Sequence, residues 1–258
     1  MIISHKYKYI FIKTTKTAGT SVEISLSRFC GEDDIITPLM AKDEATRLEY
    51  GVEPQNFTRP LKIREYSRGD WWRFVSQQKR PAVPHFWNHI AAAQIKERIA
   101  PDIWDTYYKF CFVRNPWDRA ISRYFWNIEK TGNQESLDES LKNNDPNSNF
   151  DIYSIDNQVA ANFIGKYENL LIDLTNICKT LDIPFDGWLP RAMGTSRKVR
   201  KHYSDILSSE QADYIHQKCA SEIELFGYQF SPENCTLEST WRSIALWMIT
   251  QTDYMVMQ

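Results

Sequence analysis

The sequence has few cysteines and no long apolar run, and each absence excludes a class of protein. Its five cysteines are odd in number, scattered and without paired metal spacing, so no disulfide framework is expected and a reducing compartment is favoured. No apolar run reaches the roughly 18 residues of a membrane span, and none follows basic residues at the N-terminus. We therefore predict a cytoplasmic protein without a transmembrane segment.

Neither sign of charge dominates, which limits the partners. The chain carries 31 Lys and Arg against 33 Asp and Glu, and its pI is near 6.2, so a nucleic-acid partner is not expected and any basic site must be local. Glycine-rich dinucleotide motifs, Gly-x-Ser-x-Gly, repeats and metal-type clusters are also absent, so no metal is predicted. With 258 residues, 42% of them hydrophobic, the chain fits one α/β domain with an insertion.

What the sequence does contain is a strand, a short loop and a helix within its first thirty residues. Residues 7–12 are apolar enough for a buried strand, and a helix is entered near Gly19. The first N–H groups of a helix lack intrahelical partners and attract an anion. The predicted phosphate contacts in this loop are Lys16 for its charge, Gly19 for close approach, and Thr20 and Ser21 for their hydroxyls. Because Lys16 precedes the nearest glycine, the loop differs from an ordinary ATP or GTP loop.

A second strand-to-helix turn follows residues 107–113, which are too apolar for a half-exposed strand. Arg114 comes at the carboxyl end of this strand, where ligands gather in open α/β sheets. Asn115 fits a helix N-cap, with Pro116 at the first helical position. Arg114 and Ser122 are eight residues apart and can converge on one phosphate, whereas the alternative for Arg114 is a structural ion pair.

A histidine candidate lies between the two turns. The apolar spacing of residues 88–100 predicts an amphipathic helix that Pro101 ends, with Asn88 as its N-cap. His89 would then lie in the first turn, where the helix dipole disfavours the protonated ring. On composition alone, a single histidine of this kind is more often structural than catalytic.

The remaining segments give weaker signals. Residues 31–88 are broken by proline and glycine and predict a loop-rich cap, whose aromatic residues either fill the cap or contact an acceptor. Residues 131–156 predict a polar loop, and the chain is expected to turn helical over residues 157–164. Residues 231–258 predict a tail that packs on the body, with a homodimer contact or a membrane-surface helix as alternatives.

Two motifs together resemble one family. Lys-Thr-Ala-Gly-Thr-Ser at 16–21 is similar to the 5′-phosphosulfate loop of sulfotransferases that use 3′-phosphoadenosine 5′-phosphosulfate (PAPS). Phe-Val-Arg-Asn-Pro-Trp-Asp-Arg-Ala-Ile-Ser-Arg-Tyr at 112–124 is similar to the 3′-phosphate motif of that family. The branch that the chain resembles is that of the carbohydrate and heparan-type O-sulfotransferases. Thr15 departs from the pattern, which has proline there, and Lys13 adds a charge that could compete with Lys16.

The resemblance implies a fold, a cosubstrate and roles for residues. It implies an α/β domain over residues 1–230, with a P-loop-like central parallel sheet flanked by helices and the loop-rich insertion. Catalysis would use Lys16 at the leaving 5′-phosphate and His89 as general base, with His85 as the alternative base. Arg114 and Ser122 would bind the 3′-phosphate of PAPS. The phosphosulfate end would be contacted by the loop residues Lys13, Lys16, Thr17, Ala18, Gly19, Thr20 and Ser21. The basic run at 190–203 would close over the nucleotide through Arg197 and Lys198.

The implied reaction moves a sulfuryl group from PAPS to a hydroxyl, or less favourably an amine, of a carbohydrate or small-molecule acceptor without a metal. Two other classes stay open on the sequence. A P-loop kinase would share the strand, loop and helix but would need ATP and Mg²⁺. A catalytically silent nucleotide-binding or interaction protein would keep the fold without using His89.

Overall fold

A computed structural model describes residues 1–78, 80–132, 135–143, 146, 148–190 and 201–230. The predicted nucleotide contacts Arg197 and Lys198 and the predicted tail 231–258 lie outside the described residues.

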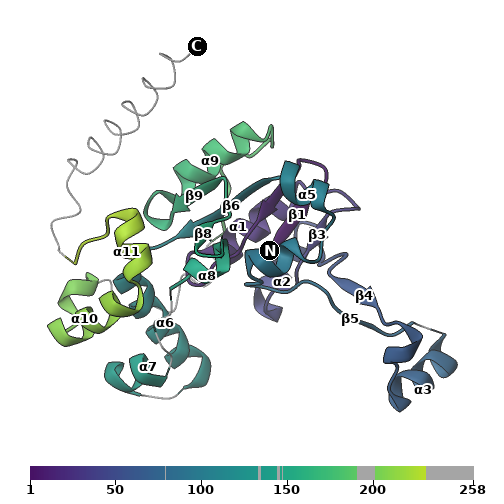
Figure 1. Ribbon diagram of the computed structural model, residues 1–258, viewed down its shortest axis with the longest axis horizontal. Helices are drawn as coiled ribbons and strands as arrows, with labels where there is room; N and C mark the ends of the chain where they lie inside the picture. The colour runs from purple at the N-terminus through teal and green to yellow at the C-terminus, as the bar shows by residue number, and fades with distance from the viewer. Residues whose placement is uncertain (79, 133–134, 144–145, 147, 191–200, 231–258) are drawn as a thin grey trace, which may run out of the picture.

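A five-stranded sheet forms the centre of the molecule (Figure 1). Its spatial order is β3 (Ile35–Ile36), β1 (Ile2–Ser4), β2 (Tyr9–Phe11), β6 (Tyr108–Val113) and β9 (Phe163–Lys166). Strands β2, β6 and β9 run parallel, whereas β1 pairs antiparallel with both β2 and β3. The predicted α/β fold is confirmed, and both predicted buried strands lie in its parallel part.

Alternation along β2 explains how helices cover both faces of the sheet. Tyr9 and Phe11 pack with α1 (Gly19–Ser27) and α9 (Leu170–Thr180) in one apolar cluster. Ile10 and Ile12 point to the opposite face and pack in a second cluster that includes residues of α4 (Ala92–Lys96), α5 (Pro101–Thr106) and α8 (Phe150–Tyr153). The carboxyl ends of β2 and β6 therefore sit in a layered core that fixes the two turns following them.

A third apolar cluster joins helices beyond the sheet. The long helix α6 (Pro116–Thr131) packs there against α10 (Ser209–Lys218) and α11 (Ala220–Phe226) through Trp117, Ile121 and Ile215. The other described elements of the body are α2 (Ala41–Leu48), α7 (Leu137–Asn143), β7 (Ser154–Ile155), β8 (Gln158–Val159) and the short 3₁₀ turns η2 (Tyr167–Asn169) and η3 (Tyr203–Asp205).

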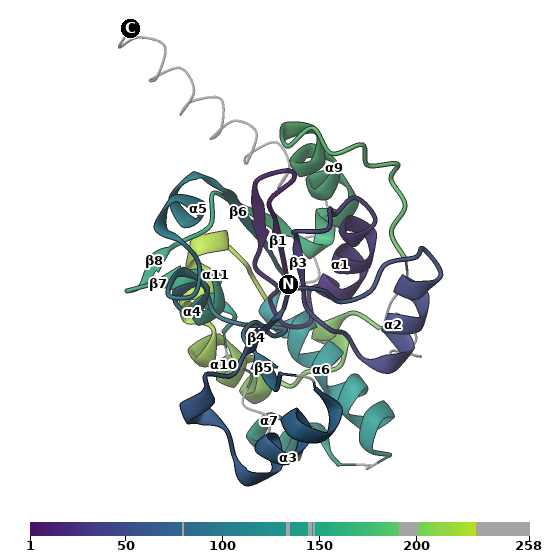
Figure 2. The same ribbon diagram turned by 90° about the vertical axis from the view of Figure 1, so that its right-hand side faces the viewer.

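The predicted cap contains more regular structure than its prolines and glycines indicate. Strands β4 (Thr58–Pro60) and β5 (Ala82–Pro84) form an antiparallel hairpin, whose connection carries the 3₁₀ turn η1 (Ile63–Glu65) and α3 (Arg68–Gln77). This hairpin stands away from the body in Figure 1, and in the turned view of Figure 2 it faces the viewer.

Two further predictions of secondary structure are wrong. The expected loop 131–156 contains α7 and α8, and the expected helix 157–164 runs into β9. Phe163 and Ile164 pair with Phe110 and Cys111 of β6, so the parallel sheet decides their conformation. Gly165 permits this pairing, because a Cβ there would come within 2.4 Å of the Phe112 ring.

The predicted helix over residues 88–100 is also wrong. Only Ala92–Lys96 is helical, Asn88 is no N-cap, and His89 has a left-handed backbone with φ 59°. Pro101 begins α5 instead of ending the preceding helix, which is the N-terminal position that proline tolerates. Within the described ranges, no helix combines the length and apolar character that crossing a bilayer requires.

Candidate functional site

The turn from β2 into α1 has the backbone features of an anion-binding loop. Ala18 occupies the N-cap of α1 with φ 59° and has no side-chain acceptor to offer the first helical N–H groups. Lys16 also has a left-handed backbone, with φ 60°. When right- and left-handed backbone conformations alternate along a chain, successive N–H groups point toward one site, as in anion-binding loops. The predicted helix start at Gly19 is confirmed.

Lys13 and Gly19 pack against each other behind this turn. A Cβ on Gly19 would lie 2.8 Å from Cγ of Lys13, so glycine is needed to accommodate the lysine stem. The Lys13 ammonium is buried and lies 2.7 Å from Oε2 of Glu23 in α1. Burial acts to raise the pKa of Glu23, but the charges and hydrogen bonds of Lys13 and the N-terminal ammonium together hold that pKa below its usual value. The charge of Lys13 is thus engaged by Glu23, and its nucleotide contact stays a prediction.

Hydroxyl groups of the loop have different surroundings. Thr17 is buried, and its Oγ1 lies 2.8 Å from Oγ1 of Thr14, which itself donates to the carbonyl of Phe112 in β6. The Thr17 hydroxyl is therefore engaged inside the protein, and the predicted contact of Thr17 with a ligand stays a prediction. Thr20 is half-buried in the first turn of α1, and Ser21 beside it is buried.

Lys16 lies among other cations. Its Nζ is 4.9 Å from the centre of the Trp126 ring in α6, a cation–π distance. Burial, followed by the charges of Arg114 and Arg123, lowers the pKa of Lys16 to about 8. Three neighbouring positive groups form a local field that attracts an anion although the whole chain is slightly acidic.

The two predicted turns touch through Arg114. Nη1 of Arg114 donates to the carbonyl of Lys16 at 3.1 Å, across 98 positions of sequence. Nη2 of Arg114 also lies 2.7 Å from Asp118, and the guanidinium stacks 3.9 Å from the centre of the Tyr167 ring. The structural ion pair and the contact with the first turn are thus both present. A guanidinium has five N–H donors, so hydrogens on both Nη atoms remain for a ligand.

Helix α6 begins as predicted and carries Ser122. The side chain of Asn115 accepts from the N–H of Trp117 at 3.1 Å and from that of Asp118 at 3.3 Å. Glu168 in turn accepts the N–H of Asn115 at 2.8 Å. Ser122 is half-buried and lies one turn beyond Asp118 on the same face of α6, the face that pairs with Arg114.

His89 is held at the first turn by a backbone contact. Nδ1 of its ring lies 2.9 Å from the carbonyl of Lys13, and because a carbonyl only accepts, Nδ1 carries the proton. The neutral ring therefore presents Nε2 as an acceptor. The His89 side chain is partly exposed, but its ring is surrounded by protein. This desolvation, followed by the nearby Lys13 charge, lowers the pKa of His89 to about 4. The ring is neutral at pH 7, but burial and Lys13 are the cause instead of a helix dipole.

The alternative base His85 lies in the bend after β5, where its N–H donates to the carbonyl of Phe57 at 2.8 Å. Its side chain is half-buried. The structure thus connects His89, and not His85, to the phosphate-type turn by a side-chain hydrogen bond among the residues it describes.

Sequence reasoning missed Asn149, which fixes the first turn from outside. Its Oδ1 accepts from the N–H of Thr15 at 3.0 Å and from the Thr15 hydroxyl at 2.7 Å, and its Nδ2 donates to the Thr15 carbonyl at 3.0 Å. A proline at position 15 would have no N–H to donate. Asn149 is itself buried, and its N–H donates to Glu222 at 3.1 Å. Nothing local to residue 149 signals this role, because its partner lies 134 positions away.

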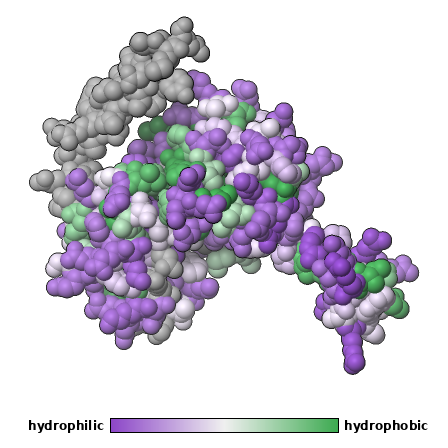
Figure 3. Space-filling view, in the orientation of Figure 1, coloured by the Kyte–Doolittle hydropathy of each residue, from purple (hydrophilic) through white to green (hydrophobic). Residues whose placement is uncertain are grey.

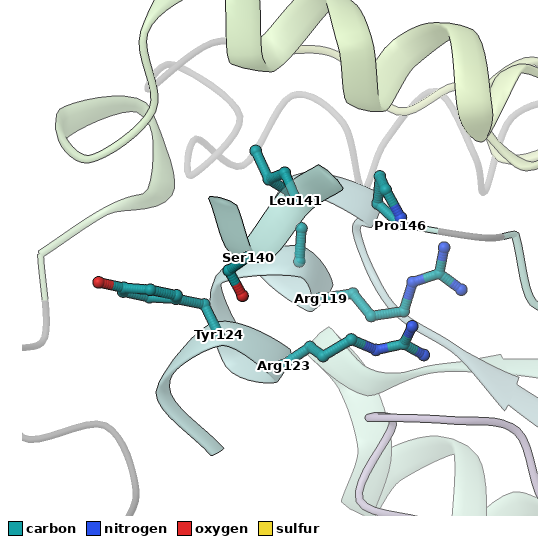
Figure 4. A pocket seen from close by; sticks show the side chains of 7 residues that line it. Arg119, Arg123, Tyr124, Ser140, Leu141 and Pro146 are labelled. Carbon is teal, nitrogen blue, oxygen red and sulfur yellow. The ribbon is translucent and has the colours of Figure 1, made fainter. Parts of the chain in front are cut away.

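Two cavities adjoin this region. The smaller lies between α6 and α7 beside Arg119 and Tyr124 (Figure 4), and its volume of about 10 Å³ admits no more than one water. The larger measures about 450 Å³ and is lined by Thr15, Arg123, Ser148, Asn149, Asp151, Ile152 and Lys218. Only the larger can take a substrate group, and Thr15 connects it directly to Lys16 of the loop.

Comparison with known proteins establishes the family. A sequence model of the sulfotransferase family matches residues 1–229, so the chain belongs to the sulfotransferase family. An uncharacterised protein of Archaeoglobus fulgidus is 33% identical over 109 residues, which cover 37% of this chain and 84% of the relative. No solved structure matches the chain. Among the described residues, no three His, Cys, Asp or Glu side chains are grouped as a metal site would need.

Proposed function

We propose that the protein transfers the sulfuryl group of PAPS to a hydroxyl of a carbohydrate or small metabolite, with an amine as the less favoured acceptor. The hydrogen bond from Arg114 to the Lys16 carbonyl is the observation that carries this proposal. It joins the uncapped start of α1, which suits a 5′-phosphate, to a guanidinium that suits a 3′-phosphate. A nucleotide with phosphates at both ends matches this pair of groups better than ATP does.

Lys16 supports the departure of the nucleotide. Sulfuryl transfer resembles loose phosphoryl transfer, so the protein contributes mainly positioning and charge stabilisation. As the bond from sulfur to the 5′-phosphate oxygen breaks, negative charge grows on that oxygen. The Lys16 ammonium and the N–H groups of the first turn of α1 are the groups that would neutralise it.

His89 is the proposed base. As the acceptor oxygen bonds to sulfur, its proton would pass to Nε2, the ring nitrogen left unprotonated by the contact with the Lys13 carbonyl. A pKa of about 4 makes the ring a weak base before substrate binds. The negative charge of a bound sulfonated nucleotide would raise that pKa toward neutrality. Such a base typically contributes about 10²–10⁴ in rate.

Arg114 and Ser122 are proposed to select the nucleotide, and the larger cavity to admit the acceptor. Charge-assisted hydrogen bonds to a 3′-phosphate, of about 1.5–3 kcal/mol each, would favour PAPS over nucleotides that lack this group. The 450 Å³ cavity reaches Thr15, next to Lys16, and has polar and charged walls suited to a hydroxylated molecule.

Calorimetry with adenosine 3′,5′-bisphosphate and ATP, each with and without Mg²⁺, tests the proposal. We expect the bisphosphate to bind without metal and more tightly than ATP, and labelled PAPS then to transfer its label in an acceptor screen. Preference for ATP with Mg²⁺ would indicate a kinase. Binding of the bisphosphate without transfer, and no effect of His89→Ala on any function, would indicate a catalytically silent protein.

A further inference from the structure

The projecting hairpin, residues 58–84, differs in charge from the rest of the chain. We call this segment, which comprises β4, η1, α3 and β5, the arm. Its sequence holds seven Lys and Arg against two Asp and Glu, a net charge of +5 in a chain whose net charge is −2. The arm is thus a strongly basic element on an acidic body, and Figure 1 places it away from that body.

The two acidic residues of the arm are engaged within it. Glu65 lies 2.9 Å from Arg59, and it also accepts the N–H of Lys62 at 2.8 Å. Asp70 accepts from the N–H and the hydroxyl of Ser67, which caps α3. Both carboxylates serve the internal structure of the arm, so its remaining cations define the charge it presents.

Apolar side chains share this surface. Tyr66, Trp71 and Phe74 form a small aromatic cluster, with ring centres 5.3–6.3 Å apart, in which Trp71 is itself 46% exposed. Outside this cluster, Trp72 is 70% exposed and Val75 is 73% exposed. Figure 3 shows hydrophobic residues on the outer part of the projecting element beside hydrophilic ones. An element that presents both cations and large apolar groups to water is typical of a docking surface.

Ile63 extends the exposed apolar surface next to Arg64. Its side chain is 70% exposed in the 3₁₀ turn that leads to α3. On α3, Arg68 and Trp72 are one turn apart, as are Trp72 and Val75, so they lie on one face of the helix. Basic groups therefore border the exposed tryptophan and aliphatic side chains.

We propose that the arm docks on the surface of a membrane that contains anionic lipids. Such a surface offers negative headgroups for the arginines and an apolar layer for Trp72, Val75 and Ile63, the combination used by interfacial helices. A soluble acidic polysaccharide would satisfy the cations and stack on the tryptophan but would leave the aliphatic side chains in water. A second copy of the arm carries the same positive charge and would repel it.

Co-sedimentation with phosphatidylcholine vesicles, with and without phosphatidylserine, tests this proposal on the full chain. We expect binding that requires phosphatidylserine and weakens with added salt. The double variant Arg68→Gln/Arg73→Gln should bind about 20- to 30-fold more weakly, since each arginine near an anionic bilayer contributes about fivefold. Trp72→Ser/Val75→Ser should also lose binding while keeping the charge.

A charge-matched control separates the arm from general electrostatics. Lys142→Gln/Lys179→Gln removes two exposed lysines from α7 and α9 and should bind within about threefold of the wild type. Thermal unfolding and bisphosphate binding should be the same in all variants, so the result is independent of the proposed reaction. Equal binding to vesicles without phosphatidylserine, unchanged binding by both arm variants, or capture by soluble heparin without vesicle binding would each overturn the proposal.

Discussion

The two strand-to-helix turns of this protein begin their helices in opposite ways. In the first, Ala18 leaves the N–H groups of α1 without a side-chain cap. In the second, Asn115 caps α6, and Pro116 removes one N–H altogether. Because α6 satisfies its own first turn, we propose that ligand binding at the second turn depends on the neighbouring side chain of Arg114. The first turn is thus suited to hold a phosphate by its backbone, and the second by a guanidinium.

The two turns also differ in the free-energy cost of their backbone conformations. Left-handed backbones at Lys16 and Ala18 are each unfavourable by about 1–3 kcal/mol for residues other than glycine, and they persist only where surrounding contacts hold them. The three hydrogen bonds between Asn149 and Thr15 are such contacts. The second turn has a local cap, and Glu168 adds one distant contact by accepting the N–H of Asn115.

Lys16→Ala, a substitution in the first turn, should have the largest effect on activity. We expect kcat for sulfuryl transfer to fall about 10²–10³-fold, as when one preorganised group that stabilises transition-state charge is removed. Lys130→Ala is the matched control, because its ammonium stacks 4.8 Å from the same Trp126 ring but is exposed. If both variants lose activity equally, the stacking on Trp126, and not the charge in the loop, is what matters.

The pH dependence of kcat/KM should separate the contribution of Lys16 in the first turn from that of the proposed base His89. His89 is active when neutral, so activity should fall about tenfold per unit below its pKa of about 4. Lys16 is active when protonated, so activity should fall in the same way above its pKa of about 8. Steady-state kinetics measured from about pH 3 to about pH 10 cover both limbs of the profile and check this expectation. An acidic limb near pH 6.5, the ordinary value for histidine, would contradict the surroundings assigned to His89.

Asn149→Ala should loosen the first turn and spare the second. Loss of the hydrogen bonds to Thr15 should weaken binding of adenosine 3′,5′-bisphosphate about five- to tenfold, the equivalent of about 1–1.4 kcal/mol. The exposed Asn143 of α7 offers the control variant Asn143→Ala, for which calorimetry should give wild-type affinity. Equal affinities for the two variants would mean that the turn keeps its shape without Asn149.

Asn115→Ala should have the smallest functional effect. Removal of the cap of α6 should lower the free energy of unfolding by about 1 kcal/mol, measured by urea denaturation. Preference for the bisphosphate over 5′-AMP should stay at the wild-type value, because Arg114 provides it. Loss of that preference in Asn115→Ala would show that the cap also positions the guanidinium.

The sequence predicts the parts of this fold that depend on local signals. The run 107–113 is apolar because β6 is buried on both faces, and Asn115 with Pro116 marks a helix start by chemistry within three residues. The helix after the first loop is predicted for the same reason, since small residues and the apolar positions that follow Gly19 define its beginning.

What the sequence does not predict depends on partners far along the chain. Residues 88–91 are not helical although their apolar spacing permits a helix, and the left-handed backbone of His89 accompanies the bond of its ring to the Lys13 carbonyl, 76 positions away. Lys13 and Glu23 form a buried ion pair that no local pattern in the sequence reveals. Asn149 carries no motif at all, so its support of Thr15 becomes visible only in three dimensions.

One calorimetric comparison tests most directly whether the two turns bind the 5′- and 3′-phosphates of a single nucleotide. Adenosine 3′,5′-bisphosphate and 5′-AMP are titrated into the wild type and into Arg114→Gln. For the wild type, loss of the 3′-phosphate should weaken binding about 10- to 100-fold, and for Arg114→Gln it should change the affinity less than about threefold. If the wild type binds both nucleotides equally, or if Arg114→Gln still prefers the bisphosphate, Arg114 does not bind the 3′-phosphate and the account is contradicted.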